Sequence, residues 1–371
     1  MKILVTGGAG FIGSHLVDAL VKARHTVTVL DNLDPQVHGA KQRKPSYLNP
    51  KAIFVRGDVR DLKIVKKLIK NQDILFHKAA AVGVAQSMYE IARYTDSNTM
   101  GAATILQAVA DGNHQLKKII VASTMSLYGE GRYTCQRHGV ITSSMRPLEQ
   151  LNKQQWEMTC PQCRKIVKPH STPESKTLSP TSIYAINKRD HEEMFMLVGR
   201  TYNIPTVTLR YFNAYGTRQA LSNPYTGAAA IFSSAMLNNI SPHIFEDGKQ
   251  SRDFVHVKDI VQANLLVMRK KEANFGIFNV GTGRHLSIIQ LASKIARELN
   301  FKKGCDITHT FRAGDIRHCF ANIRKIKKLG YQPRIRFEDG LKELCHWVAT
   351  QHSSSDSVKA HEILLKRGLS S

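Results

Sequence analysis

The stretch Lys2-Ile-Leu-Val-Thr-Gly-Gly-Ala-Gly-Phe-Ile-Gly-Ser-His-Leu16 decides the fold around which the rest of the chain is organised. It begins with a short apolar run that predicts a strand, and it ends in an amphipathic pattern that predicts a helix. Between and within these elements stand Gly7, Gly10 and Gly13. A strand, a glycine turn and a helix in this order are the context in which such glycines bind a dinucleotide.

Each glycine has its own part in such a site. Gly7 allows the tight turn, Gly10 lets backbone N–H groups approach a pyrophosphate, and Gly13 lets the helix pack closely on the strand. The helix would begin at Phe11 and Ile12, where free N–H donors and the positive end of the helix dipole favour phosphate groups. The alternative is a chance cluster of glycines in an ordinary turn.

Composition limits the classes of protein to consider. The chain has 371 residues, 42% hydrophobic and 22% charged, which suits one large domain or two smaller ones. No apolar run approaches the roughly 18 residues of a membrane helix, and no cleavable signal pattern opens the chain. We therefore expect a cytoplasmic protein without a membrane partner. The net charge of +24 favours acidic partners, but the charges are scattered and do not indicate nucleic-acid binding.

Strands alternate with helical patterns through the first half of the chain. We expect strands at 26–30, 52–55, 73–77 and 118–122, and a long helix over about 87–110. This alternation predicts a doubly wound parallel α/β sheet. Ligands bind at the carboxyl ends of such strands. The candidate cofactor residues at these ends are Asp31, Asn32, Asp58, Val59, Ala79 and Ala80.

Asp31 follows Gly13 at close to the spacing, about 20 residues, at which an acid meets the adenosine ribose hydroxyls. An acid at this position favours NAD over NADP, because it would repel a 2′-phosphate. A simple turn aspartate is the alternative. Asp58 would contact the adenine edge or stabilise a turn. Asn98, inside the predicted helix, would either contact the cofactor or hydrogen-bond the backbone.

Hydroxyl groups follow the strand at 118–122, in the run Ala122-Ser-Thr-Met-Ser-Leu-Tyr-Gly129. Further along, Tyr184 and Lys188 stand four residues apart on a predicted helix, so both lie on one face. An amine that carries a positive charge lowers the pKa of a nearby phenol from about 10. We therefore expect Tyr184 to act as a general base or acid.

Together these motifs resemble the extended short-chain dehydrogenases/reductases, and among them the NAD-dependent nucleotide-sugar epimerase/dehydratase family, of which UDP-galactose 4-epimerase is the best-known type. The resemblance covers most of residues 1–350, apart from the segment near 130–175. It rests on the ordered motifs Thr6–Ser14, Asp31-Asn32, Ser123-Thr124, Tyr128-Gly129, Tyr184 with Lys188, Leu209–Gly216, Arg252–Asp259, Phe278–Gly281 and Arg312–Asp315. It implies a Rossmann-type domain at 1–215, a smaller C-terminal substrate domain at 216–350 with segments that return to the large domain, and a tail at 353–371.

The resemblance also implies roles for single residues. Thr124 matches the hydroxyl that bonds the sugar oxygen at C4. Tyr184 matches the base, and Lys188 matches its partner, which also bonds the nicotinamide ribose. Asn213 matches a substrate-binding asparagine, Arg252 and Arg312 match arginines that hold the nucleotide diphosphate, and Asp315 matches a nucleotide-ribose contact. The substrate residues implied are thus Thr124, Ser126, Asn213, Arg252, Arg312 and Asp315.

Residues that the other enzymes of the family require are absent here, which favours a nucleotide-sugar 4-epimerase. Dehydratases carry Asp-Glu after the catalytic Thr, where this chain has Met125-Ser126. Decarboxylating relatives need a Glu at the position of Ser126, and ketosugar reductases use a Cys/His pair whose Cys is absent beside Thr124. The 4-epimerase oxidises C4 with tightly held NAD, rotates the keto sugar and reduces it again. A dehydratase, a ketosugar reductase and a non-catalytic dinucleotide sensor are the alternatives.

The segment 130–175 has a different character. Cys135 and His138 form a C-x-x-H pair, and Cys160 and Cys163 form a C-x-x-C pair. Three thiolates and an imidazole suit a closed tetrahedral zinc site, while free thiols or a redox pair are alternatives. A cysteine-bearing insertion here resembles dTDP-L-rhamnose 4-epimerases, and dTDP-L-rhamnose and UDP-hexoses are the substrates expected. By the same resemblance, helices that start near Ser87 and Ser182 would pair two subunits as a homodimer.

Overall fold

The computed structural model describes residues 1–142, 145–221, 223, 227–312, 314–351 and 366–369. Its centre is a sheet of seven parallel strands in the order β14-β9-β5-β4-β1-β2-β3. The strands are β1 (Lys2–Thr6), β2 (Thr26–Asp31), β3 (Ile53–Arg56), β4 (Ile74–His77), β5 (Lys118–Thr124), β9 (Thr206–Tyr211) and β14 (Ile277–Val280). The predicted doubly wound fold is confirmed, and each predicted strand lies within two residues of its observed bounds.

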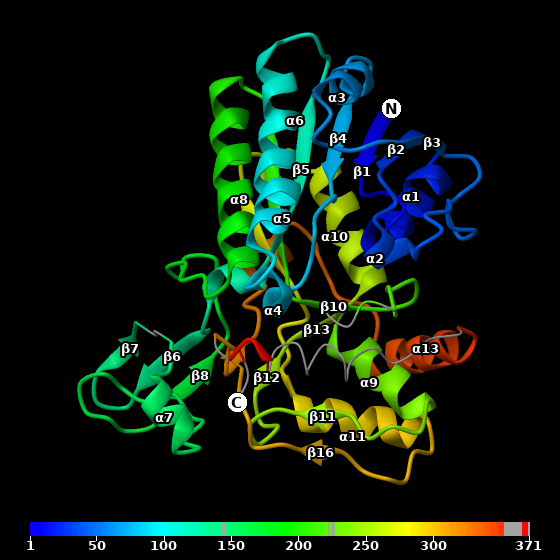
Figure 1. Cartoon of the computed structure of the whole chain (residues 1–371). Coiled ribbons are helices and arrows are strands. Elements are labelled where there is room, and N and C mark those ends of the chain that lie inside the picture. The colour runs from blue at the N-terminus through cyan, green and yellow to red at the C-terminus, as the bar shows by residue number, and fades with distance from the viewer. Residues whose placement is uncertain (143–144, 222, 224–226, 313, 352–365, 370–371) are drawn as a thin grey trace.

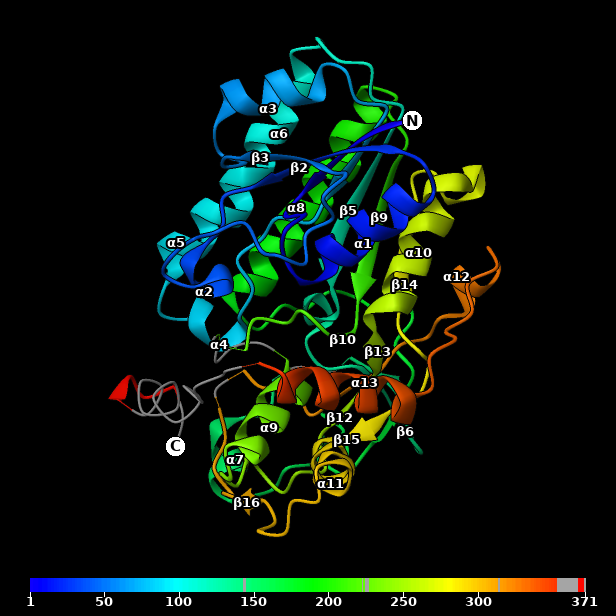
Figure 2. The ribbon, with the colours of Figure 1, turned by 90° about the vertical axis from the view of Figure 1, so that its right-hand side faces the viewer.

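Helices cover both faces of the sheet (Figure 1, Figure 2). Helices α1 (Phe11–Lys22) and α10 (Val257–Arg269) cover one face, and α3 (Leu62–Ile69), α6 (Gly101–Ala110) and α8 (Ile183–Thr201) cover the other. Successive strand residues point to opposite faces. Ile3 and Val5 therefore pack with Leu16 of α1, whereas Leu4 packs with Ile105 of α6. The strand order reverses beside β1, which is where ligands bind in such sheets.

The long helix predicted over 87–110 is interrupted. Helix α4 (Val84–Ser87) ends where the prediction begins, and α5 (Ile91–Thr95) starts after a short non-helical link. A π-helical turn, η1 (Asp96–Met100), then joins α5 to α6. Single π-turns of this kind are frequent at functional sites, and this one holds Asn98.

Helices of the C-terminal part surround a second hydrophobic core. They are α9 (Ala228–Leu237), α11 (Ile288–Glu298) and α13 (Phe337–Ala349). Figure 1 shows this unit below the carboxyl edge of the large sheet. Helix α10 and strand β14 belong to the large sheet unit, although they follow residue 216. The short strands of this part are β10 (Asn213–Tyr215), β11 (His243–Ile244), β12 (Ser251–Arg252), β13 (Phe254–His256), β15 (Leu286–Ser287), β16 (Asp306–Ile307) and β17 (His318–Cys319).

The segment 130–175 forms a small unit of its own, which projects beside the C-terminal part (Figure 1). Strands β6 (Arg132–Cys135), β7 (Gly139–Ile141) and β8 (Lys168–His170) make an antiparallel sheet with β6 in the middle. Its core is small and includes Tyr133, Met158 and Val167. The remaining short elements are α2 (Pro35–His38), α7 (Leu148–Asn152), α12 (Arg324–Lys327), and the 3₁₀ turns η2 (Met125–Tyr128) and η3 (Lys271–Ala273).

Among the described residues, no helix has both the length and the apolar character that crossing a membrane requires.

Candidate active site

The glycine turn packs backbone against backbone, as a dinucleotide site requires. Gly7 has φ +66°, and a Cβ on it would lie 2.6 Å from the N atom of Ala79. A Cβ on Gly13 would lie 2.0 Å from the O atom of Gly7. Gly10 is different, because its nearest neighbour would be Gly7 O at 3.4 Å. A side chain would therefore clash at Gly7 and Gly13 but has space at Gly10. Helix α1 begins directly after Gly10, with Phe11 and Ile12.

Carboxylates gather at the ends of β2 and β3. Asp31 ends β2 and is 8% exposed, and its Oδ2 accepts a hydrogen bond from Ala9 N (3.0 Å) in the glycine turn. Asn32 Nδ2 donates to Asp58 Oδ2 (2.9 Å), and hydrogen bonds from Arg60 lower the pKa of Asp58 to about 2. Asp58 is therefore an anion at neutral pH.

Asn98 fixes the segment that follows β4. Its Oδ1 accepts from Ala81 N (2.9 Å) and its Nδ2 donates to Ala81 O (3.1 Å). The backbone-bonding role weighed for Asn98 is therefore what the structure shows. The same segment packs against the glycine turn, because a Cβ on Gly7 would lie 2.6 Å from Ala79 N. Val59 packs instead against Gly101 at the start of α6.

Thr124 and Tyr184 meet at the carboxyl end of β5. Thr124 is the last residue of β5, and its side chain lies close enough to the Tyr184 side chain to affect the pKa of that phenol. Its Oγ1 also accepts from Ser126 N (3.2 Å) and lies 3.3 Å from Ser126 Oγ. Tyr184 stands in the first turn of α8, whose N-cap Ser182 accepts from Ala185 N. Capping stabilises the start of the helix, which in turn places the phenol beside Thr124.

The pKa of Tyr184 contradicts the expectation from sequence. Burial raises it to about 12, although the hydrogen bond with Thr124 opposes this. Lys188 follows one helical turn later, and burial lowers its pKa to about 7. Its Nζ lies 3.1 Å from His191 Nδ1. The spacing of four residues predicted that Tyr184 and Lys188 share a helix face. It carries no information about burial, which removes both groups from water and so opposes charge on each of them.

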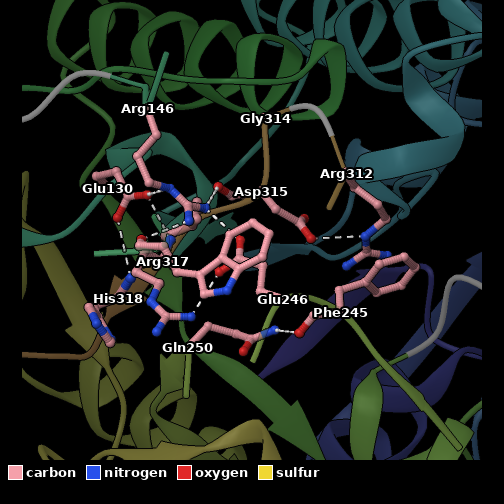
Figure 3. Close-up of polar contacts among 12 residues, drawn as sticks. Glu130, Arg146, Phe245, Glu246, Gln250, Arg312, Gly314, Asp315, Arg317 and His318 are labelled. Atoms are coloured by element: carbon pink, nitrogen blue, oxygen red, sulfur yellow. Dashed lines mark hydrogen bonds and ion pairs between the residues drawn. The ribbon is translucent and has the colours of Figure 1, made fainter. Parts of the chain in front are cut away.

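The predicted substrate residues lie across the edge of the sheet, on the C-terminal part. Asn213 begins β10, and its Oδ1 is buried without a hydrogen-bond partner among the described residues. Arg252 Nη1 donates to the backbone oxygens of Ser251 (2.9 Å) and Arg317 (3.1 Å). Arg312 and Asp315 form an ion pair of 2.9 Å, and the Arg312 guanidinium group stacks on Phe245, 4.5 Å from the ring centre (Figure 3).

The chain matches the model of the NAD dependent epimerase/dehydratase family over residues 3–152 and 160–281. It belongs to this family. A curated relative, the dTDP-L-rhamnose 4-epimerase of Burkholderia thailandensis, is 31% identical over 353 residues, which span 94% of this chain and 95% of the relative. The family match omits residues 153–159, which lie within the projecting unit at 130–175.

Solved structures agree with the family assignment. UDP-glucose 4-epimerase of Thermotoga maritima, determined with UDP-glucose, superposes with a TM-score of 0.75 at 32% identity and covers 94% of this chain and 98% of its own. UDP-glucuronic acid 4-epimerase of Bacillus cereus, in complex with UDP-glucuronic acid and NAD, has a TM-score of 0.74 at 26% identity. The match covers 94% of this chain and 99% of the Bacillus cereus chain.

The insertion at 130–175 is tied by buried charges to the C-terminal part, which carries the predicted substrate residues Arg312 and Asp315 (Figure 3). Arg146, from the insertion, is almost fully buried and donates to Glu246 Oε1 (2.7 Å) and to the backbone O of Asp315 (3.0 Å). Arg317 donates to the other oxygen, Glu246 Oε2 (2.8 Å). Glu130 accepts from the backbone N of Arg317 (2.7 Å). The network thus holds residues 315–317 of the C-terminal part against the insertion.

The four predicted metal ligands converge. One donor atom from each of Cys135, His138, Cys160 and Cys163 lies within 4.8 Å of the other three. Cys135 Sγ is 3.6 Å from Cys163 Sγ, and His138 Nδ1 is 3.3 Å from Cys160 Sγ. Tetrahedral zinc with Zn–S bonds of about 2.3 Å separates two sulfurs by about 3.7 Å. The six cysteines form no disulfides, so this donor set fits zinc.

Sequence reasoning missed two residues at the cofactor edge. Lys78 follows β4, and its Nζ donates to Tyr211 OH (2.9 Å) at the end of β9. The sequence prediction for this run named only Ala79 and Ala80 as cofactor residues. The sequence did not predict this contact for two reasons. The direction of the Lys78 side chain depends on which face of the sheet each strand residue occupies. Its partner Tyr211 lies far away in the chain, on another strand.

Proposed function

We propose that the protein is an NAD-dependent nucleotide-sugar 4-epimerase. The observation that carries this proposal is that Thr124 and Tyr184 lie together, with Lys188 one helical turn away, at the same sheet edge as the glycine turn. Met125 and Ser126 supply no acid–base group for dehydration. The names of the relatives support the proposal, since the enzymes compared above are all nucleotide-sugar 4-epimerases.

The chain's own groups support oxidation and reduction at C4. When bound, NAD supplies the hydride acceptor and donor, together with a positive ring charge that favours phenolate. Tyr184 takes the proton of the C4 hydroxyl and returns it after the keto sugar has turned. Thr124 donates a hydrogen bond to the oxygen on which charge develops. In its protonated form, Lys188 would favour the phenolate by its charge.

The substrate that we propose first is dTDP-L-rhamnose. The insertion supports it, because this cysteine-bearing segment contacts the substrate side through Arg146 and resembles the dTDP-L-rhamnose enzymes. UDP-glucose is the second candidate, since the Thermotoga maritima UDP-glucose enzyme is equally similar. Arg252 and Arg312 would hold the diphosphate of either substrate, because guanidinium groups bind phosphate oxygens in pairs.

Product analysis tests the proposal. Purified protein is incubated separately with dTDP-L-rhamnose and UDP-glucose, and the products are resolved by NMR. We expect one of them to yield its C4 epimer without net formation of NADH. Tyr184→Phe should lower kcat by about 10³-fold, within the usual range for loss of an acid–base group, while keeping bound NAD. A 4-keto-6-deoxy product would favour the dehydratase instead. Unchanged substrates with NAD bound would favour the sensor.

We infer that Cys135, His138, Cys160 and Cys163 bind a structural zinc ion. Four protein ligands leave no open position, so the zinc would stabilise the insertion and would not take part in the reaction. Its small core supports this, because such units commonly depend on metal for folding. Elemental analysis should find about one zinc per chain, and Cys160→Ser should lose it. Cys305→Ser, outside the cluster, is the matched control. Zinc-free protein with a fully folded insertion would overturn the inference.

We also infer a homodimer that forms through α5, η1 and α8. Large apolar side chains on these elements are exposed: Ile91 by 51%, Met100 by 52%, Ile186 by 46% and Leu197 by 67%. Apolar groups gathered on neighbouring helices are typical of an interface. Light scattering should give the mass of two chains, and Leu197→Glu should give one. A monomeric wild-type protein would contradict the inference.

A further inference from the structure

A buried histidine lies against Lys188, on the face of α8 that packs on the sheet. His191 is 1% exposed and Lys188 is 3% exposed. Lys188 Nζ lies 3.1 Å from His191 Nδ1, which is within hydrogen-bond distance. Among the described residues, no carboxylate forms an ion pair with Lys188. A buried amine requires a polar partner, and the imidazole of His191 is in place to be that partner.

The imidazole of His191 is fixed by neighbouring rings. Its ring centre lies 4.5 Å from that of His77, at the end of β4, and 5.2 Å from that of Phe195 on α8. His77 Nδ1 is in turn 2.7 Å from Thr6 Oγ1, on the strand that leads into the glycine turn. Close packing of this kind restricts rotation of a side chain, so Nδ1 stays directed at Lys188.

The direction of this hydrogen bond follows from charge. Burial, together with nearby positive charge, lowers the pKa of His191 well below its ordinary value, so the ring is neutral at pH 7. A neutral imidazole has one acceptor nitrogen, whereas an ammonium group only donates. When Lys188 is protonated, His191 Nδ1 therefore accepts. Such a bond favours the charged form of the donor.

The groups around this pair leave that part to His191. Glu192, the acid whose charge raises the pKa of Lys188, is itself paired with Arg210. Burial opposes positive charge on His77 and on Lys78, and it lowers the pKa of both. The titratable and charged groups around the pair are Tyr184 and Glu192 from α8, His77 and Lys78 from the end of β4, and Arg210 from β9.

We propose that His191 is a positioning residue for the proposed reaction, which accepts a hydrogen bond from Lys188 Nζ, holds the amine in place and favours its protonated form. The inference rests on the proposed function, in which the ammonium group favours the phenolate of Tyr184. His191 acts only through Lys188. Without this acceptor, burial would act on Lys188 unopposed by it, and the pair of phenolate and ammonium group would form less often.

The test measures the protonation of Lys188 directly. The full chain is labelled with ¹³C at the lysine ε carbons, and NMR follows these signals between about pH 5 and 9. The Lys188 signal is the one that Lys188→Met removes. We expect His191→Phe to lower its titration midpoint by about one pH unit, the size expected for loss of a hydrogen bond to a charged group. An unchanged midpoint would overturn the inference.

Further variants separate the hydrogen bond from ring packing. His191→Asn should keep the wild-type midpoint, because an asparagine Oδ1 follows Cγ as Nδ1 does in histidine and also accepts. Phe195→Leu alters the neighbouring ring but leaves the acceptor, so it should keep the midpoint as well. A shift in Phe195→Leu as large as that in His191→Phe would overturn the inference. His191→Leu also removes the acceptor and serves if His191→Phe does not fold.

Activity connects this contact to the reaction. The kcat of His191→Phe should fall about tenfold near pH 7, since one pKa unit is a factor of ten, and it should recover in His191→Asn. An unchanged kcat with a lowered midpoint would overturn the positioning role. Wild-type protein that converts neither dTDP-L-rhamnose nor UDP-glucose would overturn the proposed function instead, while the titration would still decide whether His191 stabilises protonated Lys188.

Discussion

Tyr184 and Lys188 lie one turn apart on α8, and burial moves their pKa values in opposite directions, to about 12 and about 7. Their identity and shared face follow from the sequence, because helical spacing is local information. Their pKa values do not, because they depend on how many apolar groups surround them in the folded chain. The same holds for Lys78, whose partner Tyr211 lies on a distant strand.

The lowered pKa of Lys188 predicts how stability depends on pH. Between its folded pKa of about 7 and its ordinary value of 10.5, the unfolded chain binds more protons than the folded chain. Stability from this group therefore rises with pH across that window and is lost as pH falls toward 7. Lys188→Met should remove this part of the slope. Melting temperatures of both proteins from pH 7 to 10 check it, and parallel curves would contradict it.

At the scale of elements, local patterns predicted the strands and the glycine turn, whereas tertiary contacts decided the rest. The apolar periodicity over 87–110 continues through the break between α4 and α5, so it did not show the interruption. That break and the π-turn place Asn98 where it bonds Ala81. Asn213, at the start of β10, was predicted from the family pattern, and its role as a substrate contact stays a prediction.

The glycine turn yields a paired prediction. Gly13→Ala should lower the melting temperature and abolish cofactor binding, because its Cβ would lie 2.0 Å from Gly7 O and the turn must open. Gly10→Ala has its nearest contact at 3.4 Å, so it should fold as wild type but bind NAD more weakly. Thermal unfolding and cofactor content of the two variants are the measurements. Equal stability of both would show that close packing at Gly13 is not required.

At the scale of the whole molecule, one network of buried charges joins the insertion to the C-terminal part that carries Asp315 and Arg317. The sequence showed the four metal ligands by their spacing but did not show this docking. Arg146 and Arg317 approach Glu246 from two distant segments. Within the network, removing one partner leaves a buried carboxylate less well neutralised, which is strongly destabilising.

Arg146→Met should therefore loosen the insertion from the substrate side. We expect KM for the nucleotide sugar to rise about tenfold or more with a smaller change in kcat, because residues 315–317 lose their support while Thr124 and Tyr184 stay in place. Limited proteolysis should cut the insertion faster. Arg137→Met, on the insertion but outside the network, is the control. A fall in kcat alone would contradict the positioning role of Arg146.

The central claim is that the protein removes and returns the same hydrogen at C4 of a nucleotide sugar. The most direct measurement uses dTDP-L-rhamnose deuterated at C4, with UDP-glucose deuterated at C4 in parallel, and reads the product by NMR and mass spectrometry. We expect a C4 epimer that retains its deuterium, with no hydrogen taken from solvent at that carbon. An epimer that has exchanged its deuterium with solvent would contradict it.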